Sequence, residues 1–184
     1  MSSLNKLAAS AKFNLNRINK NLIPGTLAEF IALTTSSNKK LYLVGLDIGK
    51  MKCGVAISDD LQNVAIPLDI VATKFLTSYL ENINRQICVS GFIIGLPLTT
   101  AGNLGSSSVS ICTIINEMAD FINKTNSPIW LHDERYSTTA SYSLFKSKKS
   151  SPKLVDDLCA MKILQEHLDS RKVQGPTRAN DLQR

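Results

Sequence analysis

The sequence has few of the features that define disulfide-rich, zinc-binding or membrane-spanning proteins. Its cysteines lie far apart and no two form a CxxC pair, which excludes a disulfide framework or a zinc cluster as the basis of the fold. They are expected to be small buried hydrophobic residues in a reducing, intracellular compartment. No apolar run is long enough to span a bilayer, so no membrane partner is expected.

Acidic residues are scarce at the two ends of the chain. Residues 1–40 hold six lysines and arginines against one acid, and residues 171–184 hold four against one, so the net charge of +6 arises in the ends. Residues 1–40 are predicted to be an amphipathic basic extension. This extension is either a transit peptide for a mitochondrial or plastid matrix, or a docking helix of a cytoplasmic protein. Residues 171–184 are predicted to be a disordered basic tail.

Residues 41–170 fit one α/β domain, and a short helix is expected ahead of it over residues 27–33. The expected strands are 41–48, 53–58, 64–68, 89–95 and 128–132, and the expected helices are 73–86, 106–123, 137–146 and 153–169. The first three strands form a meander, and the later strands alternate with helices. This order predicts a mixed five-stranded sheet, with parallel strands added to the meander and helices on both faces.

An aspartate interrupts the apolar strand over residues 41–48. Asp47 ends an apolar run, and a turn at Gly49 and a second apolar strand from Gly54 follow it. An ionised carboxylate inside an apolar strand is costly to bury unless a cation or hydrogen bonds offset it. The position therefore favours a ligand or catalytic role over a purely structural one.

Two further segments bring acids to the ends of predicted elements. Asp133 and Glu134 follow the strand over 128–132, and Asp156 and Asp157 lie in the first turn of the last helix. Acids in a first turn also complement the helix dipole, so each position alone is ambiguous. Together they supply the carboxylate oxygens that a hard divalent cation binds. His132 is interpreted as a flanking strand residue.

Five motifs, in order, resemble the YqgF/RuvX family, the Holliday-junction-resolvase-like branch of the ribonuclease H-like superfamily. They are LDIGKMKCGVAISD (46–59), IPL (66–68), GFIIGLPLTTAG (91–102), LHDERYST (131–138) and VDDLCAMKILQEHL (155–168). Lys50 and Lys162 depart from the commonest pattern of the family. The resemblance implies a ribonuclease H-like fold and metal-dependent nuclease chemistry. In bacteria it implies maturation of the small-subunit ribosomal RNA precursor, with the ribosome as a further partner; a Holliday-junction-type nuclease of branched DNA is the alternative.

The resemblance also assigns the site residues by their positions in these motifs. It implies that Asp47, Glu134 and Asp156 are catalytic and bind metal, and it leaves Asp133 and Asp157 as spare carboxylates. The implied cofactor is Mg²⁺ or Mn²⁺. In the implied two-metal hydrolysis, Asp47 bridges both ions and the other two acids each complete one side. The sequence gives no indication of oligomeric state.

Basic and polar residues near these acids are candidates for phosphate contacts. The lysine-rich loop before the last helix is either a solvated loop or a phosphate-binding one. The polar, glycine-containing loop after the strand over 89–95 lies where ligands bind in such sheets, although it also serves as a connector. The candidate nucleic-acid-binding residues are Lys146, Lys148, Lys149, Lys153, Arg135, Thr99 and Asn103.

Two other functions fit parts of the sequence. The spacing of Asp47, Gly49 and Gly54 also resembles the first phosphate loop of sugar kinases and actin-like ATPases. Those proteins need two large lobes, whereas this chain supplies one domain. The second alternative is a non-catalytic relative that binds RNA or a ribosome without cutting, and the retained acids argue against it.

Overall fold

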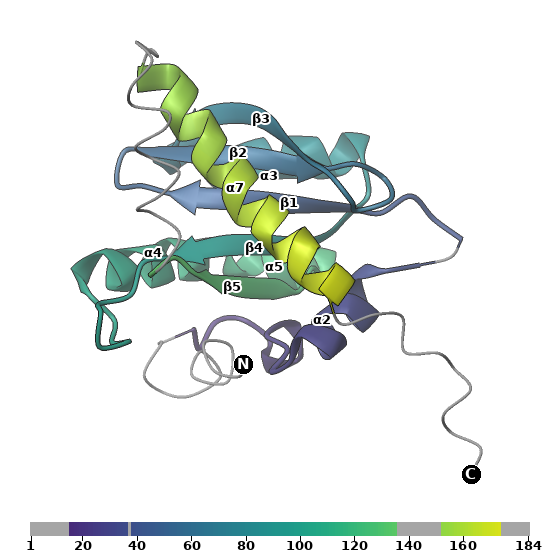
Figure 1. Ribbon diagram of the computed structural model, residues 1–184, viewed down its shortest axis with the longest axis horizontal. Coiled ribbons are helices and arrows are strands. Elements are labelled where there is room, and N and C mark those ends of the chain that lie inside the picture. Colours follow the sequence, from purple (N-terminus) through teal and green to yellow (C-terminus); the bar gives the residue numbers. More distant parts are fainter. Residues whose placement is uncertain (1–14, 37, 136–151, 174–184) are drawn as a thin grey trace.

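A five-stranded mixed sheet forms the centre of the molecule (Figure 1). The structure is a computed structural model that describes residues 15–36, 38–135 and 152–173, without the side chains of 152–157 and 173. The strand order is β3-β2-β1-β4-β5. The antiparallel meander consists of β1 (Tyr42–Ile48), β2 (Lys52–Ser58) and β3 (Ala65–Ala72), and the parallel strands are β4 (Val89–Leu96) and β5 (Ile129–Asp133). The predicted mixed sheet is confirmed.

Helices cover both faces of the sheet. One face carries α3 (Leu76–Gln86), preceded by the 3-10 turn η2 (Thr73–Phe75), together with α4 (Ser106–Glu117) and α5 (Ala119–Thr125). The other face is crossed diagonally by α7 (Pro152–Val173) (Figure 1). The single helix predicted over 106–123 is wrong in one respect, because the backbone of Met118 (ψ −2°) ends α4 there. The helix predicted over 137–146 lies outside the described residues.

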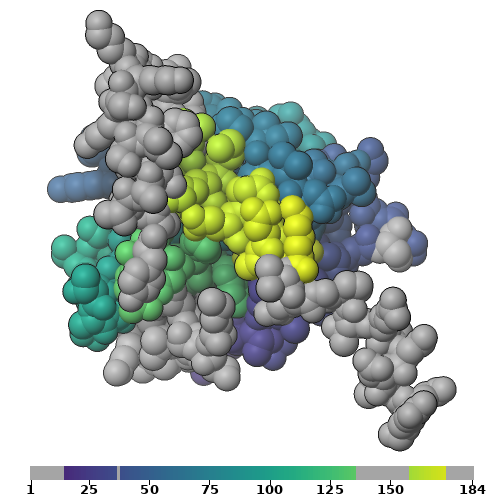
Figure 2. All heavy atoms as spheres, viewed as in Figure 1, coloured from purple at the N-terminus to yellow at the C-terminus, as the bar shows by residue number. Residues whose placement is uncertain are grey.

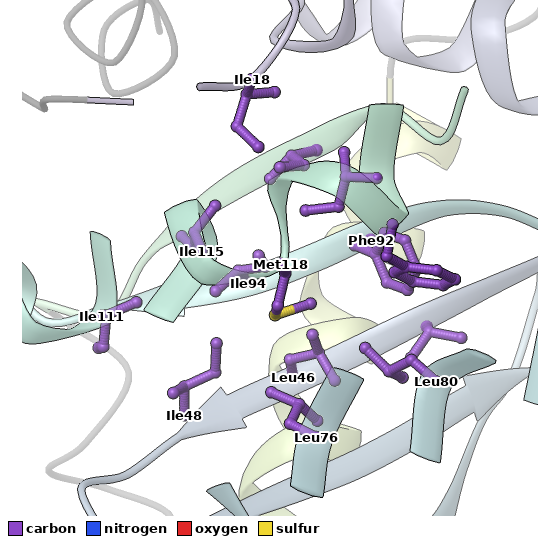
Figure 3. Packing of buried hydrophobic residues seen from close by; sticks show 14 of the residues in the cluster. Ile18, Leu46, Ile48, Leu76, Leu80, Phe92, Ile94, Ile111, Ile115 and Met118 are labelled. Atoms are coloured by element: carbon purple, nitrogen blue, oxygen red, sulfur yellow. The ribbon is translucent and has the colours of Figure 1, made fainter. Parts of the chain in front are cut away.

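Alternation along the central strands divides the core into two layers. Leu46, Ile48, Phe92 and Ile94 face α3, α4 and α5 (Figure 3). The intervening side chains face α7, in line with the two-residue period of a strand. Gly45 lets α7 approach closely, because a Cβ atom there would lie 2.7 Å from Leu164 Cβ and 2.9 Å from the carbonyl oxygen of Ala160. This contact fixes where α7 crosses β1.

Residues 15–34 pack onto the domain ahead of its first strand. Leu15, Ile18, Leu22 and Ile23 join the core on the α5 side, and Arg17 donates to Asp120 at 3.2 Å. The expected short helix is confirmed as α2 (Leu27–Thr34), whose first turn is closed by a capping box between Thr26 and Glu29. From residue 15 to 22 the described chain forms a 3-10 turn, η1 (Lys20–Leu22), rather than a long amphipathic helix.

Phe30 anchors α2 against the opposite layer of the core. Its side chain is fully buried, and a Cβ atom at Gly91 of β4 would lie 3.1 Å from its ring and 2.9 Å from Thr34. The absence of a side chain at Gly91 therefore leaves room for α2. The domain boundary predicted at residue 40 remains a prediction, but residues 15–34 are in contact with the domain.

All four cysteines are free thiols. Cys53 and Cys112 are buried, as predicted for small hydrophobic residues, and burial raises the pKa of Cys112 to about 11. Cys88 is exposed, contrary to that prediction, because it lies in the short connection between α3 and β4. Within the described part of the chain, no helix combines the length and apolar character needed to cross a membrane.

Candidate active site

The candidate active site lies under α7, at the carboxyl ends of β1 and β5. Gly45 faces α7, so Asp47, two residues further along β1, points to the same side of the sheet. His132 is paired in register with Gly95 of β4. Glu134 follows β5 directly, and its backbone N–H donates to the carbonyl of Leu96 at 3.3 Å. The parallel strands thus bring Asp47 and Glu134 to one edge of the sheet, as the sequence predicted.

Gly95 makes the space that the Glu134 carboxyl group occupies. A Cβ atom on Gly95 would lie 2.9 Å from the carboxyl carbon of Glu134 and 2.6 Å from Ile163 Cδ1 of α7. Real Cβ atoms do not approach other atoms this closely, so a side chain at position 95 would displace the carboxyl group. The glycine in the sequence motif therefore has a specific structural role, because it admits Glu134 between β4 and α7.

The surroundings of Glu134 oppose its ionisation. Burial, followed by the negative charges of Asp47, Glu166 and Asp133, raises the pKa of Glu134 to about 7, and the positive charge of Lys162 acts in the opposite direction. An acidic cluster of this kind concentrates negative charge that a bound cation would relieve. Strong pKa shifts of this origin are common at functional sites.

A second charged cluster was missed by sequence reasoning. His132 Nε2 lies 2.9 Å from Glu166 Oε2, and Lys162 Nζ lies 3.7 Å from Glu166 Oε1. His132 is therefore more than a flanking strand residue, because its ring binds α7 beside the site. Lys162 and Glu166 are separated by one helical turn, and this spacing was the available signal that the two side chains can meet.

Arg135 is fixed at the rim of the site. It binds Asp133 through its backbone N–H and its guanidinium group, with an Nε–Oδ2 distance of 2.9 Å. Burial opposes ionisation of Asp133, but these hydrogen bonds outweigh it and lower the pKa of the Asp133 carboxyl group. The Asp133 carboxyl group is therefore bound chiefly to Arg135. A Cβ atom at Gly102 (φ +78°) would lie 2.9 Å from Arg135 Nη1, so the guanidinium reaches the loop after β4.

The loop after β4 is held together by contacts within the loop. Leu98 and Leu104 form a bridge, and the hydroxyl of Thr99 accepts from the backbone N–H of Asn103 at 3.0 Å. The side chains of Thr99 and Asn103 are exposed. Ser108, at the start of α4, is buried and donates to the carbonyl of Pro97, so its hydroxyl belongs to the loop rather than to a ligand.

Several predicted site residues lie outside the described side chains. They are Asp156 and Asp157, and the lysines Lys146, Lys148, Lys149 and Lys153. The backbone of α7 is described at Asp156, one turn before Ala160, which contacts Gly45. Within the described residues no three His, Cys, Asp or Glu side chains gather closely enough to hold a metal ion. The described part thus supplies two of the three expected ligands.

The fold matches that of a solved structure of RuvC. The structure of "T. thermophilus RuvC in complex with Holliday junction substrate" aligns with a TM-score of 0.51 at 10% sequence identity. The alignment covers 72% of this chain and 96% of that one. This likeness defines the fold as the ribonuclease H-like α/β class of the RuvC resolvases.

Sequence comparison narrows the class to one family. Residues 41–170 match the family described as "RuvX: Holliday junction resolvase". The chain is 34% identical to the "Putative pre-16S rRNA nuclease" of Ehrlichia canis, over 74% of this chain and 90% of the relative. It is also 34% identical to the protein of the same name from Rickettsia rickettsii (strain Sheila Smith), over 71% and 87%. The chain belongs to the RuvX family, and it is a nuclease, a hydrolase acting on phosphodiester bonds of nucleic acid.

Proposed function

We propose that the protein is an endonuclease that cleaves the precursor of small-subunit ribosomal RNA with the help of Mg²⁺ or Mn²⁺. The observation that carries the proposal is the convergence of Asp47 and Glu134 over Gly95, where the pKa of Glu134 rises to about 7. The names of the relatives from Ehrlichia canis and Rickettsia rickettsii support the choice of substrate. Branched DNA is the second candidate substrate, because the matching family is described as a Holliday junction resolvase.

The donor set fits a hard divalent cation. Asp47 and Glu134 offer carboxylate oxygens, and their mutual repulsion leaves negative charge that a cation would neutralise. Asp156 is the third proposed ligand, since it precedes the Gly45 contact of α7 by one turn. When bound, such ions activate water and stabilise the leaving oxygen of a phosphodiester.

The other residues of the site hold the substrate and the ligands in place. His132 of β5 binds Glu166 of α7 and so joins the strand to the helix beside Glu134, and Lys162 pairs with the same carboxylate from within α7. Arg135, held by Asp133, directs its guanidinium to the loop after β4, where it would meet a phosphate together with Thr99 and Asn103. The lysines at 146, 148, 149 and 153 are proposed to contact further phosphates. Phosphate contacts position the strand but do not read its sequence.

Cleavage by the purified protein tests this function. A precursor RNA fragment that spans the end of the small-subunit RNA should be cut in the presence of Mg²⁺, and a four-way DNA junction is the comparison substrate. Asp47→Asn should abolish cleavage, while Glu117→Gln removes an acid at the end of α4 and should leave it intact. Intact RNA and intact DNA with the wild-type protein would leave only the non-catalytic, RNA-binding alternative.

Metal binding can be measured without any substrate. Mg²⁺ or Mn²⁺ should raise the Tm of the wild-type protein, because a ligand that binds only the folded state stabilises it. The Tm of Asp47→Asn should not respond, and that of Glu117→Gln should respond normally. An equal rise in all three proteins would contradict a shared metal site.

We also propose the import role of residues 1–40 as one of two alternatives. A reporter fused to these residues should enter a mitochondrion or plastid if they form a transit peptide. The docking alternative has support in the structure, because residues 15–34 already pack onto the domain. Retention of the reporter in the cytoplasm would favour docking alone.

A further inference from the structure

The turn between β1 and β2 is joined to the segment before α3. The backbone N–H of Thr73 donates to the carbonyl of Met51 at 3.0 Å, and its hydroxyl donates to the carbonyl of Gly49 at 2.8 Å. These two bonds bring the tip of the turn beside the residues that follow Thr73. The resulting surface, called the hairpin patch below, consists of Lys50, Met51, Lys52, Lys74 and Phe75.

The hairpin patch combines exposed apolar side chains with uncompensated positive charge. Met51 is 76% exposed and Phe75 is 54% exposed, although both are large hydrophobic residues. Among the described residues, no carboxylate forms an ion pair with any of the three lysines of the patch. Lys74 Nζ instead lies 4.8 Å from the centre of the Phe75 ring. Neither burial nor internal ion pairing therefore accounts for this combination, which suits a partner with negative charge and flat apolar groups.

The hairpin patch also lies at the edge of the sheet that holds the acidic site. The turn begins two residues after Asp47, a strand distance of about 7 Å. In Figure 1 the turn lies at the left, where β1 and β4 end, and in Figure 2 its blue atoms project at the left margin. A strand bound at Asp47 therefore has the patch within reach of its neighbouring nucleotides.

We infer that the hairpin patch binds a single-stranded stretch of nucleic acid beside the cleaved bond. This inference rests on the proposed nuclease function and names one more part of its substrate site. The lysines would contact phosphates, and Phe75 would stack on an unpaired base. A single strand is the fitting partner, because the faces of its bases are open, whereas bases in a duplex are already stacked. Such contacts accept any sequence.

Binding to labelled oligonucleotides, measured in EDTA so that no strand is cut, tests the charges of the patch. The probes are single-stranded RNA, single-stranded DNA and duplex DNA of the same mixed sequence. The triple variant Lys50→Ala, Lys52→Ala, Lys74→Ala should weaken single-strand binding and flatten the dependence of log K on log salt by about two units. The matched control is Lys20→Ala, Arg85→Ala, Lys124→Ala, which removes the same charge from exposed positions elsewhere. It should leave the slope unchanged.

Variants of Phe75 test the stacking contact. Phe75→Ala should lower single-strand affinity by about 5- to 150-fold, the range measured for loss of one base–aromatic stack. Phe75→Tyr should restore affinity, whereas Phe75→Leu should not. Duplex binding should change little. The relative affinities for the RNA and DNA strands identify which of the two the patch holds.

Two outcomes separate this inference from the proposed function. If the wild-type protein binds single strands through the patch but cuts nothing with Mg²⁺, the proposed function fails and the patch remains a binding surface. If it cuts, but the triple variant and Phe75→Ala bind single strands like the control, the inference is overturned. A loss confined to duplex binding would overturn it as well.

Discussion

Glu166 and His167 are neighbours on α7, yet their side chains enter opposite environments. Glu166 is bound by His132 and Lys162 at the half-exposed edge of the acidic site. His167 is buried between Phe30 and Trp130, with ring centroids at 5.2 and 5.8 Å. Neither ring nitrogen of His167 has a hydrogen-bond partner among the described residues. Burial lowers the pKa of His167 to about 3, so its ring stays neutral.

The same contrast runs along β5. Trp130, His132 and Glu134 occupy alternate positions and so share one face of the sheet, which α7 covers. The series passes from an aromatic contact to a charged one and then to the acidic site. β5 and α7 thus form an aromatic contact that stabilises the fold at one end and the acidic site at the other. Substitutions at the two ends should affect stability and activity separately.

The largest effect is expected at the aromatic end. Phe30→Ala removes a fully buried ring from the contact between α2, β5 and α7, and should lower the free energy of unfolding by about 3–5 kcal/mol. Chemical denaturation measures this change. Leu33→Ala, at a 52%-exposed position of the same helix, is the control and should cost far less. A Phe30→Ala protein as stable as this control would show that the Phe30 ring contributes little to the fold.

Substitutions of two glycines allow the effects on stability and on activity to be compared directly. Gly95→Ala should displace the Glu134 carboxyl group and reduce cleavage by about 100-fold, the effect of misplacing a catalytic group by about 1 Å. Gly45→Ala should destabilise the protein by about 1–3 kcal/mol, because its Cβ meets the backbone of α7. Because the Gly45 contact also sets the position of α7, the Gly45 variant should lose stability and cleavage together, whereas the Gly95 variant should lose mainly cleavage. If Gly95→Ala cuts normally, Glu134 is not held for catalysis.

The pH dependence of stability should reveal His167. Its pKa is lower in the folded protein than the ordinary value of 6.5, so the unfolded chain takes up this proton first as the pH falls. The contribution to stability is complete above about pH 6.5 and decreases by about 1.4 kcal/mol per pH unit below it, or about 2 kcal/mol at pH 5. His167→Phe should remove this part of the slope. Parallel pH profiles for both proteins would mean that the ring is not buried as described.

The smallest effect on stability is expected for Glu166→Gln. Its ion pairs are partly exposed, so the free energy of unfolding should change by less than about 1 kcal/mol. If Glu166 positions α7 beside Glu134, the same variant should nevertheless change the Mg²⁺-induced rise in Tm. Gln165→Glu, which adds a charge at the preceding helix position without removing Glu166, is the control. No change in the response to Mg²⁺ would make the His132–Glu166 pair purely structural.

The sheet could be predicted because its strands carry local signals. Apolar runs and turn residues located all five strands, and the order of elements gave the mixed topology. The end of β3 was missed because Asp69 and exposed side chains break its pattern, while pairing with β2 extends it to Ala72. For residues 15–34 the sequence left docking as one of two alternatives. The choice depends on contacts with distant residues, such as Asp120 and Asn123, which no local pattern reveals.

The acids of the site were also visible in the sequence, whereas their supports were not. Asp47 and Glu134 stand at the ends of apolar strands, and topology alone brings them together. Glu166 and His132 meet only because α7 crosses the sheet at Gly45. The place where the helix crosses depends on packing between distant segments. The space that Gly95 provides likewise depends on a neighbour on another strand. Contacts of this kind require the folded arrangement.

The docking of residues 15–34 has a consequence for the nascent chain during synthesis. Arg17 is made 103 residues before its partner Asp120, and at usual rates of synthesis about 5–20 s separate the two. During that interval the apolar side chains of the segment have no surface of their own domain to cover them. A chaperone or an import receptor would have to recognise them then, because the finished fold buries them. Recognition by a receptor and packing onto the domain are therefore compatible in the same segment if recognition comes first.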